Sequence, residues 1–241
     1  MIVIPMAGLS SRFFKAGYTK PKYMLEAHGM TLFDHAVMSF EKYFISEKFI
    51  FIVRDVYNTA DFVKKSLEKL GIKNFKVVIL DKETRGQAET VYLGLKDIEV
   101  NDNSSITIFN IDTFRPGFIY PELKNMGDGY LEVFKGSGDN WSFVKSENKD
   151  SNKVIETTEK KPISDLCCSG LYYFSTRGIF ELAYQDYIRK SEKDWDSGEL
   201  YIAPIYNYLI NNGYQITYNL INRNEVIFCG VPHEYNEFMA L

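Results

Sequence analysis

The chain has 241 residues, 45% of them hydrophobic and 25% charged, which is ordinary for a globular protein with a sizeable core. Its formal net charge of −4 argues against nucleic acid as the main partner. The three cysteines, Cys167, Cys168 and Cys229, argue against a disulfide framework and a structural zinc site, so we expect a cytoplasmic protein. The apolar run at its start is too short to cross a membrane, and no targeting segment or membrane partner is expected.

The first half of the chain alternates short apolar runs with segments of helical periodicity. Strands are predicted at Ile2–Met6, Phe49–Val53, Phe75–Leu80 and Ile106–Asn110, and helices at Thr31–Phe44, Asn58–Leu70 and Gln87–Lys96. This alternation predicts an α/β fold in which helices flank a mixed, mostly parallel central sheet. Ligands of such sheets bind beyond the carboxyl ends of the strands, so the segments that follow the strands are the candidate binding segments.

The second half of the chain predicts shorter, partly antiparallel strands. These are expected at Tyr130–Phe134, Trp141–Lys145, Val154–Thr158 and Leu171–Phe174, with an exposed hairpin tip at Lys145–Lys153. Helices are predicted at Thr176–Lys190 and Glu199–Asn212, strands at Gln215–Leu220 and Val226–Cys229, and a short helix from His233. No linker is long enough to separate two independent domains, so residues 1–241 are predicted to form a single domain.

The first strand runs directly into a small, hydroxylated loop, Ala7–Arg12, and a second cationic cluster follows at Lys20-Pro21-Lys22. Small residues let the backbone approach a bound group, and the backbone amides and hydroxyls can donate hydrogen bonds to phosphate oxygens. Arg12 and Lys22 would add positive charge at the phosphates. The alternative is a plain strand-to-helix turn with solvent-facing bases, and the loop alone does not decide between the two.

Two later segments also follow predicted strands. Gly86-Gln87 precedes a predicted helix, where the glutamine amide could recognise a nucleobase edge, although a helix start capped by Thr84 explains these residues at least as well. Asp112 follows the strand that ends at Asn110, where a carboxylate is well placed to bind Mg²⁺. The alternative for Asp112 is a buried, paired carboxylate. We favour the metal, because no partner for Asp112 is evident in the sequence.

Seven segments occur in an order that resembles the sugar-nucleotide pyrophosphorylases: PMAGLSSRF, KPKYML, TRGQAETV, NIDT, EKKPISDLCCSGLYYF, ELYIAPIYNYL and FCGVPHEY. The resemblance covers nearly the whole chain. It implies a nucleotidyltransferase with a Rossmann-like, GT-A-like fold and a small antiparallel sheet on the acceptor side. Such an enzyme joins a nucleoside triphosphate (NTP) to a phosphorylated acceptor and releases pyrophosphate. Residues 1–115 would form the nucleotide-binding half and residues 116–241 the acceptor-binding half.

The resemblance also implies roles for individual residues. The NTP would lie on Met6, Ala7, Gly8, Leu9, Ser10 and Ser11, with Gly86 and Gln87 at the base. Arg12 would contact the leaving pyrophosphate, Lys22 would steady the reacting phosphates, and Asp112 would bind the Mg²⁺ cofactor. The acceptor would lie on Glu159, Lys161, Gly170 and Glu199.

This chain departs from the family pattern in three places. Its first loop has Leu9, Ser10 and Ser11 where the family has more glycine and a threonine. Cys229 stands where the family often has a second metal-binding aspartate, which implies a metal site with one aspartate. The additional Lys160 leaves the choice between Lys160 and Lys161 open.

The two ends of the chain are most similar to small cytidylyltransferases of capsule biosynthesis, which implies CTP as the NTP and phosphoglutamine as the acceptor, giving CDP-glutamine. A sugar 1-phosphate with a cytidylyl, uridylyl or thymidylyl donor is the alternative. A GT-A glycosyltransferase would usually carry an Asp-x-Asp motif, and Asn110-Ile111-Asp112 has only the second acid. A non-catalytic nucleotide-binding regulator also stays open. The exposed-looking aromatic residues of the second half could form the contact of a homodimer.

Overall fold

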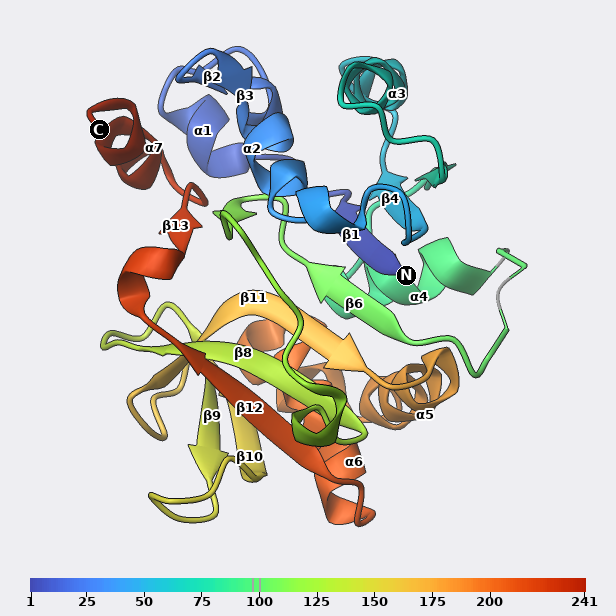
Figure 1. Ribbon diagram of the computed structural model, residues 1–241, viewed down its shortest axis with the longest axis vertical. Helices are drawn as coiled ribbons and strands as arrows, with labels where there is room; N and C mark the ends of the chain where they lie inside the picture. The colour runs from blue at the N-terminus through green and yellow to red at the C-terminus, as the bar shows by residue number, and fades with distance from the viewer. Residues whose placement is uncertain (97, 100) are drawn as a thin grey trace. The chain divides into compact units, whose positions relative to one another are not determined.

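A computed structural model describes residues 1–96, 98–99 and 101–241 of the chain. The chain forms two compact units, neither of which is one continuous segment (Figure 1). The N-terminal unit consists of Ile2–Glu83, Phe109–Ile119 and Asn224–Leu241. The central unit consists of Met1, Thr84–Ile108 and Tyr120–Arg223. The division into a nucleotide-binding half and an acceptor-binding half stays a prediction.

Three parallel strands form the sheet of the N-terminal unit. They lie in the order β1 (Ile2–Met6), β4 (Phe49–Val53) and β5 (Phe75–Ile79). Every residue of β1 and β4 is buried, whereas β5 is only partly covered. The continuous apolar sequences of β1 and β4 therefore fit their burial on both faces, as is usual in parallel sheets.

The helices of this unit agree with the sequence pattern to different degrees. They are α1 (Ser11–Lys15), α2 (Leu32–Met38), α3 (Thr59–Lys69) and α7 (Pro232–Met239). α3 confirms the helix predicted at Asn58–Leu70. The prediction for Thr31–Phe44 is too long, because α2 ends at Met38 and only a short 3₁₀ turn, Glu41–Tyr43, follows. The start of α2 is well defined, since Thr31 and Asp34 form a reciprocal capping box.

The C-terminal segment of the described chain returns to the N-terminal unit. The red helix α7 lies beside the blue elements α1 and β2 in Figure 1. The hydroxyl of Tyr235 donates to the carbonyl oxygen of Glu26 at 2.8 Å, and Nε2 of His28 lies 2.7 Å from the carbonyl oxygen of Phe238. Two short antiparallel pairs complete the unit: β2 (Glu26–Ala27) with β3 (Met30–Thr31), and β7 (Thr113–Phe114) with β13 (Ile227–Phe228).

The sheet of the central unit is mixed. Its strands include β8 (Gly129–Lys135), β9 (Ser142–Ser146), β10 (Val154–Glu159), β11 (Leu166–Phe174) and β12 (Ile216–Ile221). β8 pairs with β11 antiparallel and with β12 parallel, and β9 pairs antiparallel with β10 and β11. β11 is longer than predicted, and its register against β8 shifts between Cys168 and Tyr172. The antiparallel part expected for the second half of the chain is therefore present.

The helices of the central unit are α4 (Gln87–Lys96), α5 (Arg177–Ile188) and α6 (Tyr206–Asn211). The helix predicted at Glu199–Asn212 is wrong in its first part. The backbone of Leu200 is hydrogen-bonded to Arg85 and Ala88 instead of to a helical turn of its own, and Ala203–Ile205 forms a 3₁₀ turn before α6. Strand β6 (Ile106–Phe109) lies where the chain passes from the central unit to the N-terminal unit.

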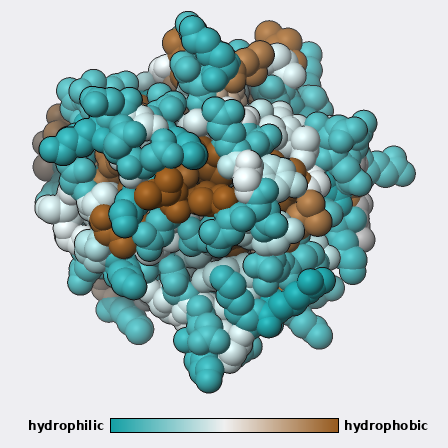
Figure 2. Space-filling model, turned by 90° about the horizontal axis from the view of Figure 1, so that it is seen from below, coloured by the Kyte–Doolittle hydropathy of each residue, from teal (hydrophilic) through white to brown (hydrophobic). Residues whose placement is uncertain are grey.

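The predicted α/β class, with a mixed, mostly parallel sheet and flanking helices, is confirmed. Most of the large aromatic side chains are buried in the cores; Phe174 and Tyr206, for example, stack with ring centroids 4.3 Å apart. Within the described residues, no helix is long and apolar enough to cross a membrane. On the face shown in Figure 2, a patch of hydrophobic residues is surrounded by hydrophilic ones.

Candidate active site

The loop after β1 is fixed to the segment that carries Lys22. Ser10 adopts the left-handed conformation with φ of 53°, and its carbonyl oxygen accepts the backbone N–H of Phe13 at 2.9 Å, at the start of α1. The hydroxyl Oγ of Ser10 accepts the backbone N–H of Lys22 at 3.1 Å. The two cationic segments noted in the sequence are therefore held together in the N-terminal unit.

Lys22 and Asp112 form an ion pair, with Nζ of Lys22 only 2.5 Å from Oδ2 of Asp112. Their side chains are 21% and 23% exposed, so the pair is accessible but not freely solvated. This partnership cannot be recognised from the sequence pattern, because the two residues are 90 positions apart. Asp112 therefore has a partner, contrary to the prediction, although its place just past β6 is as predicted.

The segment after β13 lies against Asp112. The backbone N–H of Cys229 donates to the carbonyl oxygen of Asp112 at 2.8 Å. A Cβ atom on Gly230 would lie 3.0 Å from Oδ2 of Asp112, so glycine leaves room for the carboxylate. Oε2 of Glu234 accepts the N–H groups of Gly230 and Val231 at 2.8 and 3.2 Å, which fixes the turn into α7.

The thiol of Cys229 is a poor replacement for a metal-binding aspartate. Burial raises its pKa to about 12, and the nearby charges of Glu234 and Asp112 contribute to the increase. Mg²⁺ also prefers hard oxygen ligands to the soft sulfur of a cysteine. Asp112 is then the candidate ligand in this part of the unit.

The other predicted nucleotide-binding residues of the N-terminal unit lie next to Ser10 in the sequence. Met6 and Ala7 are buried, whereas Gly8, Leu9, Ser11 and Arg12 are exposed. Ser11 and Arg12 belong to the first turn of α1 and not to the loop itself. Among the predicted residues, the structure brings together Ser10, Lys22 and Asp112.

In the central unit, the predicted nucleobase segment packs against the backbone of Leu200. The N–H of Leu200 donates to the carbonyl oxygen of Arg85 at 2.9 Å, and the N–H of Ala88 donates to that of Leu200 at 2.8 Å. Gly86 has φ of 151°, and a Cβ atom there would lie 2.5 Å from the backbone nitrogen of Leu200. Glycine is thus required by packing, and it brings the predicted Gly86-Gln87 segment next to the predicted acceptor residue Glu199.

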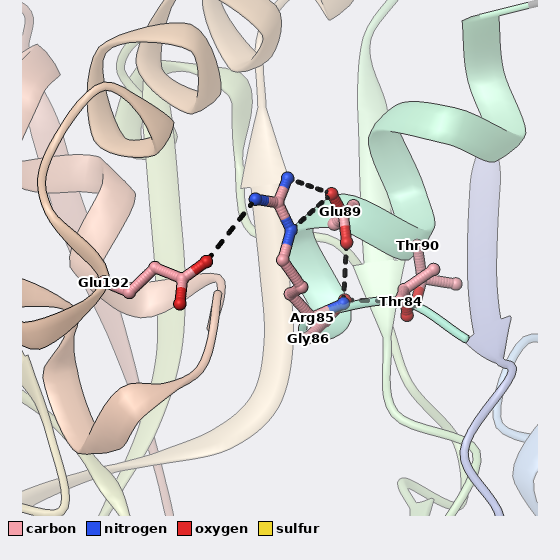
Figure 3. Close-up of polar contacts among 6 residues, drawn as sticks. All are labelled: Thr84, Arg85, Gly86, Glu89, Thr90 and Glu192. Carbon is pink, nitrogen blue, oxygen red and sulfur yellow. Dashed lines mark hydrogen bonds and ion pairs between the residues drawn. The ribbon is translucent and has the colours of Figure 1, made fainter. Parts of the chain in front are cut away.

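The side chain of Arg85 ties this segment to its own helix, as Figure 3 shows. Glu89, in the first turn of α4, accepts the backbone N–H of Arg85 at 2.6 Å and two bonds from its guanidinium. Burial alone would raise the pKa of Glu89, but these bonds and the charge of Arg85 outweigh it and lower the pKa. Arg85 also lies 4.0 Å from Glu192 and over the ring of Trp195 at 5.4 Å. The hydroxyl of Thr84 lies 2.6 Å from that of Thr90, which also donates to the carbonyl oxygen of Gly86 at 3.1 Å.

The predicted acceptor residue Glu159 ends β10 and is only 6% exposed. The hydroxyl of Ser142 donates a short hydrogen bond to Oε2 of Glu159. The backbone N–H of Glu159 donates to Oδ2 of Asp196 at 3.0 Å. Burial raises the pKa of Glu159 to about 6. The hydrogen bond from Ser142 and the charge of Lys160 oppose that rise, whereas the charges of Asp196 and Glu199 add to it. Its protonation therefore changes within the range in which many enzymes work.

The two adjacent lysines face different surroundings. Lys160 adopts a left-handed conformation with φ of 55°, and its Nζ donates to the hydroxyl of Tyr201 at 2.5 Å. The same Nζ lies 4.6 Å from the centre of the Tyr201 ring. Lys161 is exposed, and its carbonyl oxygen accepts the hydroxyl of Thr158. Lys160 is therefore the lysine that shares an environment with Glu159.

The chain is similar to one solved structure in sequence and fold, and to others in fold alone. No protein-family model and no curated protein matches the chain. The crystal structure of the nucleoside-diphosphate-sugar pyrophosphorylase from Vibrio cholerae RC9 is 59% identical, covers 100% of both chains and superimposes with a TM-score of 0.96. The chain belongs to the nucleoside-diphosphate-sugar pyrophosphorylase family.

More distant solved structures share the fold. The inositol-1-phosphate CTP transferase from T. maritima is 18% identical over 99% of this chain and 94% of its own, with a TM-score of 0.74. UDP-glucose pyrophosphorylase, in a complex with UDP-glucose, is 16% identical over 99% and 96%, with a TM-score of 0.71. At these identities the similarity concerns the fold alone, and it is the fold of nucleotidyltransferases.

The residues near Asp112 offer one carboxylate that could hold a Mg²⁺ ion. Among the described residues, no three or more His, Cys, Asp or Glu side chains are grouped so as to hold a metal ion. Proteins commonly bind Mg²⁺ through one or two carboxylates while substrate phosphates and water complete the octahedron. Asp112 with a triphosphate satisfies that pattern.

Several residues that shape these sites were not predicted from the sequence. They are Arg85, Glu89, Ser142, Asp196, Leu200 and Tyr201. The Glu89 side chain could have been anticipated, since an acid in the first turn of a helix often reaches back to the preceding amides. The contact with Leu200 could not, because it joins segments more than one hundred residues apart. Gly170 lies in β11 with φ of 96°, within the register shift that follows Cys168.

A cavity of about 710 Å³ also lies in the central unit, between the loop that contains Gly136 to Asp139 and the segment from Pro162 to Asp165. The described residues that line it include none of the predicted site residues.

Proposed function

We propose that the protein transfers a nucleotidyl group from an NTP to the phosphate of a sugar 1-phosphate and releases pyrophosphate. The observation that carries the proposal is the 59% identity, over both whole chains, to a protein described as a nucleoside-diphosphate-sugar pyrophosphorylase. The pairing of Lys22 with Asp112 just past β6 supports it, since both residue types are needed where phosphates meet a divalent ion.

In this reaction a phosphate oxygen of the acceptor attacks the α-phosphorus of the NTP, and the bond from that phosphorus to the pyrophosphate oxygen breaks. The attacking oxygen is already ionised near neutral pH, so the reaction needs no general base and no covalent nucleophile. The main obstacle is the repulsion between two polyanions. Two like unit charges about 4 Å apart repel by roughly 4 kcal/mol at an effective dielectric near 20. Positioning and positive charge must supply most of the rate.

The proposed roles follow from that requirement. Arg12 and Lys22 bind the phosphates of the NTP, Lys22 near the reacting group and Arg12 at the departing pyrophosphate. Lys160, rather than Lys161, binds the acceptor phosphate, because its ammonium lies with Glu159 and Tyr201. The carboxylate of Glu159 accepts hydrogen bonds from acceptor hydroxyls. Mg²⁺ held by Asp112 would supply further positive charge to the triphosphate.

Pyrophosphate release tests the function directly. The protein is incubated with Mg²⁺ and each NTP, alone and with a panel of sugar 1-phosphates. We expect release only when an NTP and a sugar 1-phosphate are both present. CTP with phosphoglutamine, which the two chain ends imply, belongs in the same panel and would replace the sugar 1-phosphate if it alone gave release. Hydrolysis of a nucleotide sugar without pyrophosphate release would point to a glycosyltransferase, and tight NTP binding with no release would point to a regulator.

Two substitutions connect the function to the site. Lys22→Ala and Asp112→Ala should each lower turnover by orders of magnitude, about a hundredfold or more, with the fold intact. Lys20→Ala is the matched control, because Lys20 is exposed and two positions from Lys22. Near-normal turnover of either variant would show that its side chain does not have the proposed role.

A further inference from the structure

The Lys22–Asp112 pair is anchored on both sides by backbone contacts. The backbone N–H of Lys22 is bound by Ser10, and the carbonyl oxygen of Asp112 accepts the N–H of Cys229. The Nζ to Oδ2 distance of 2.5 Å places the ammonium directly on one carboxylate oxygen. The pair is thus a defined arrangement of two fixed backbone positions and one long, flexible side chain.

In this arrangement the Lys22 ammonium and a divalent ion would compete for the carboxylate of Asp112, the proposed metal ligand. A divalent ion on the Asp112 carboxylate would lie within a few ångströms of the Lys22 ammonium, and like charges at such a distance repel strongly in a partly buried site. The carboxylate cannot hold both cations at full strength. A triphosphate resolves the conflict, because its oxygens offer the ammonium a second set of acceptors.

We propose that Lys22 occupies the metal-binding carboxylate of Asp112 in the nucleotide-free protein and moves from it to the nucleotide phosphates when the metal–NTP complex binds. This inference rests on the proposed function, since it assigns a partner exchange to the same two residues. Lys22 thereby keeps the free protein from binding a divalent ion without its nucleotide. The metal site is complete only when the triphosphate has drawn the ammonium away.

If Lys22 exchanges partners in this way, its removal should increase the affinity of the nucleotide-free protein for a divalent ion. Lys22→Met removes the ammonium, so the nucleotide-free variant should bind Mn²⁺ more tightly than the wild type, by about tenfold or more. Binding is measured by electron paramagnetic resonance of free Mn²⁺ without nucleotide. Lys20→Met is the control, because it removes the same charge from an exposed position in the same segment, and it should bind Mn²⁺ as the wild type does.

A double variant tests whether the additional Mn²⁺ binds at the carboxylate of Asp112. Lys22→Met combined with Asp112→Asn should lose the increase, since the carboxylate that binds the ion is gone. The proposal is overturned if Lys22→Met binds Mn²⁺ no better than the wild type, if Lys20→Met gains as much, or if the double variant keeps the increase.

A measurement with Lys22 in place keeps the proposal testable if Lys22→Met does not fold. Lysines of the wild type are dimethylated with ¹³C-formaldehyde, and the Lys22 signal is identified by its loss in Lys22→Arg. We expect that signal to shift when Mg²⁺ and an NTP are added together and to stay unchanged with Mg²⁺ alone. A shift with Mg²⁺ alone, or none with both, contradicts the exchange.

The outcomes separate the inference from the proposed function. Pyrophosphate release by the wild type without a gain of Mn²⁺ affinity in Lys22→Met would leave the function standing and refute the exchange. A gain of affinity in a protein that releases no pyrophosphate with any acceptor would support the exchange and refute the function.

Discussion

Replacing Glu159 by glutamine tests the energetic cost of a buried carboxylate at the proposed acceptor site. Burial raises the pKa of Glu159 from its ordinary value of 4.5 to about 6 in the folded protein. At about 1.36 kcal/mol for each pH unit, this difference amounts to about 2 kcal/mol. Because the folded pKa is raised, this group's stabilising contribution is full below pH 4.5 and is lost as the pH rises through about 6.

The wild type should therefore lose stability relative to a variant without this carboxylate as the pH rises. The difference in unfolding free energy between Glu159→Gln and the wild type should shift in favour of the variant by about 2 kcal/mol between pH 4 and pH 7.5. A glutamine oxygen can still accept the hydrogen bond from Ser142, so the substitution removes the charge and keeps the contact. Urea denaturation at a series of pH values, with both proteins side by side, measures the difference.

Glu156→Gln is the matched control. Glu156 lies on the same strand, three residues earlier, in an exposed ion pair with Lys145 at 3.5 Å. Exposed pairs contribute little, so this variant should show a pH-dependent difference below about 0.5 kcal/mol. A difference for Glu159→Gln that stays flat across the same pH range would refute the assignment of Glu159 as a carboxylate destabilised by burial.

Three further substitutions or reactions test contacts described above. Gly86→Ala should destabilise the protein by about 2–4 kcal/mol in urea, because its Cβ would overlap the backbone of Leu200; wild-type stability would contradict that packing. Gly230→Ala should cost no more than about 1 kcal/mol of stability while lowering turnover about tenfold, because its Cβ would press on the Asp112 carboxylate; unchanged turnover would mean that Asp112 tolerates displacement. The native thiols, including Cys229 with its raised pKa, should react with a disulfide reagent at pH 8 at least about a hundredfold more slowly than after denaturation, and rapid native labelling would show that they are exposed.

The elements best predicted from the sequence are those fixed by local pattern. β1 and β4 follow from continuous apolar runs, and α3 follows from its periodicity and the glycine just past its end. The predicted helix from Glu199 failed because a residue inside it, Leu200, uses its backbone groups in long-range hydrogen bonds. Local propensity carries no information about such partners.

The candidate site shows the same limit. The sequence placed Lys22 and Asp112 among the functional residues, but it could not reveal that they bind each other, since their contact depends on the fold. The choice between Lys160 and Lys161 depended on a left-handed turn at Lys160, a conformation that lysine rarely adopts and that the sequence therefore does not suggest.

The return of α7 to the start of the chain has a consequence for biosynthesis. His28 and Phe238 are 210 positions apart, and the central unit is translated between them. At roughly 5–20 residues per second, the ribosome takes many seconds to deliver the closing helix after β1 and β4 have emerged. Throughout that interval the nascent apolar strands lack part of their unit, whereas the Tyr120–Arg223 stretch is completed before α7 is made. We therefore expect the nascent N-terminal segment, and not the stretch that follows it, to be the part of this chain that chaperones hold.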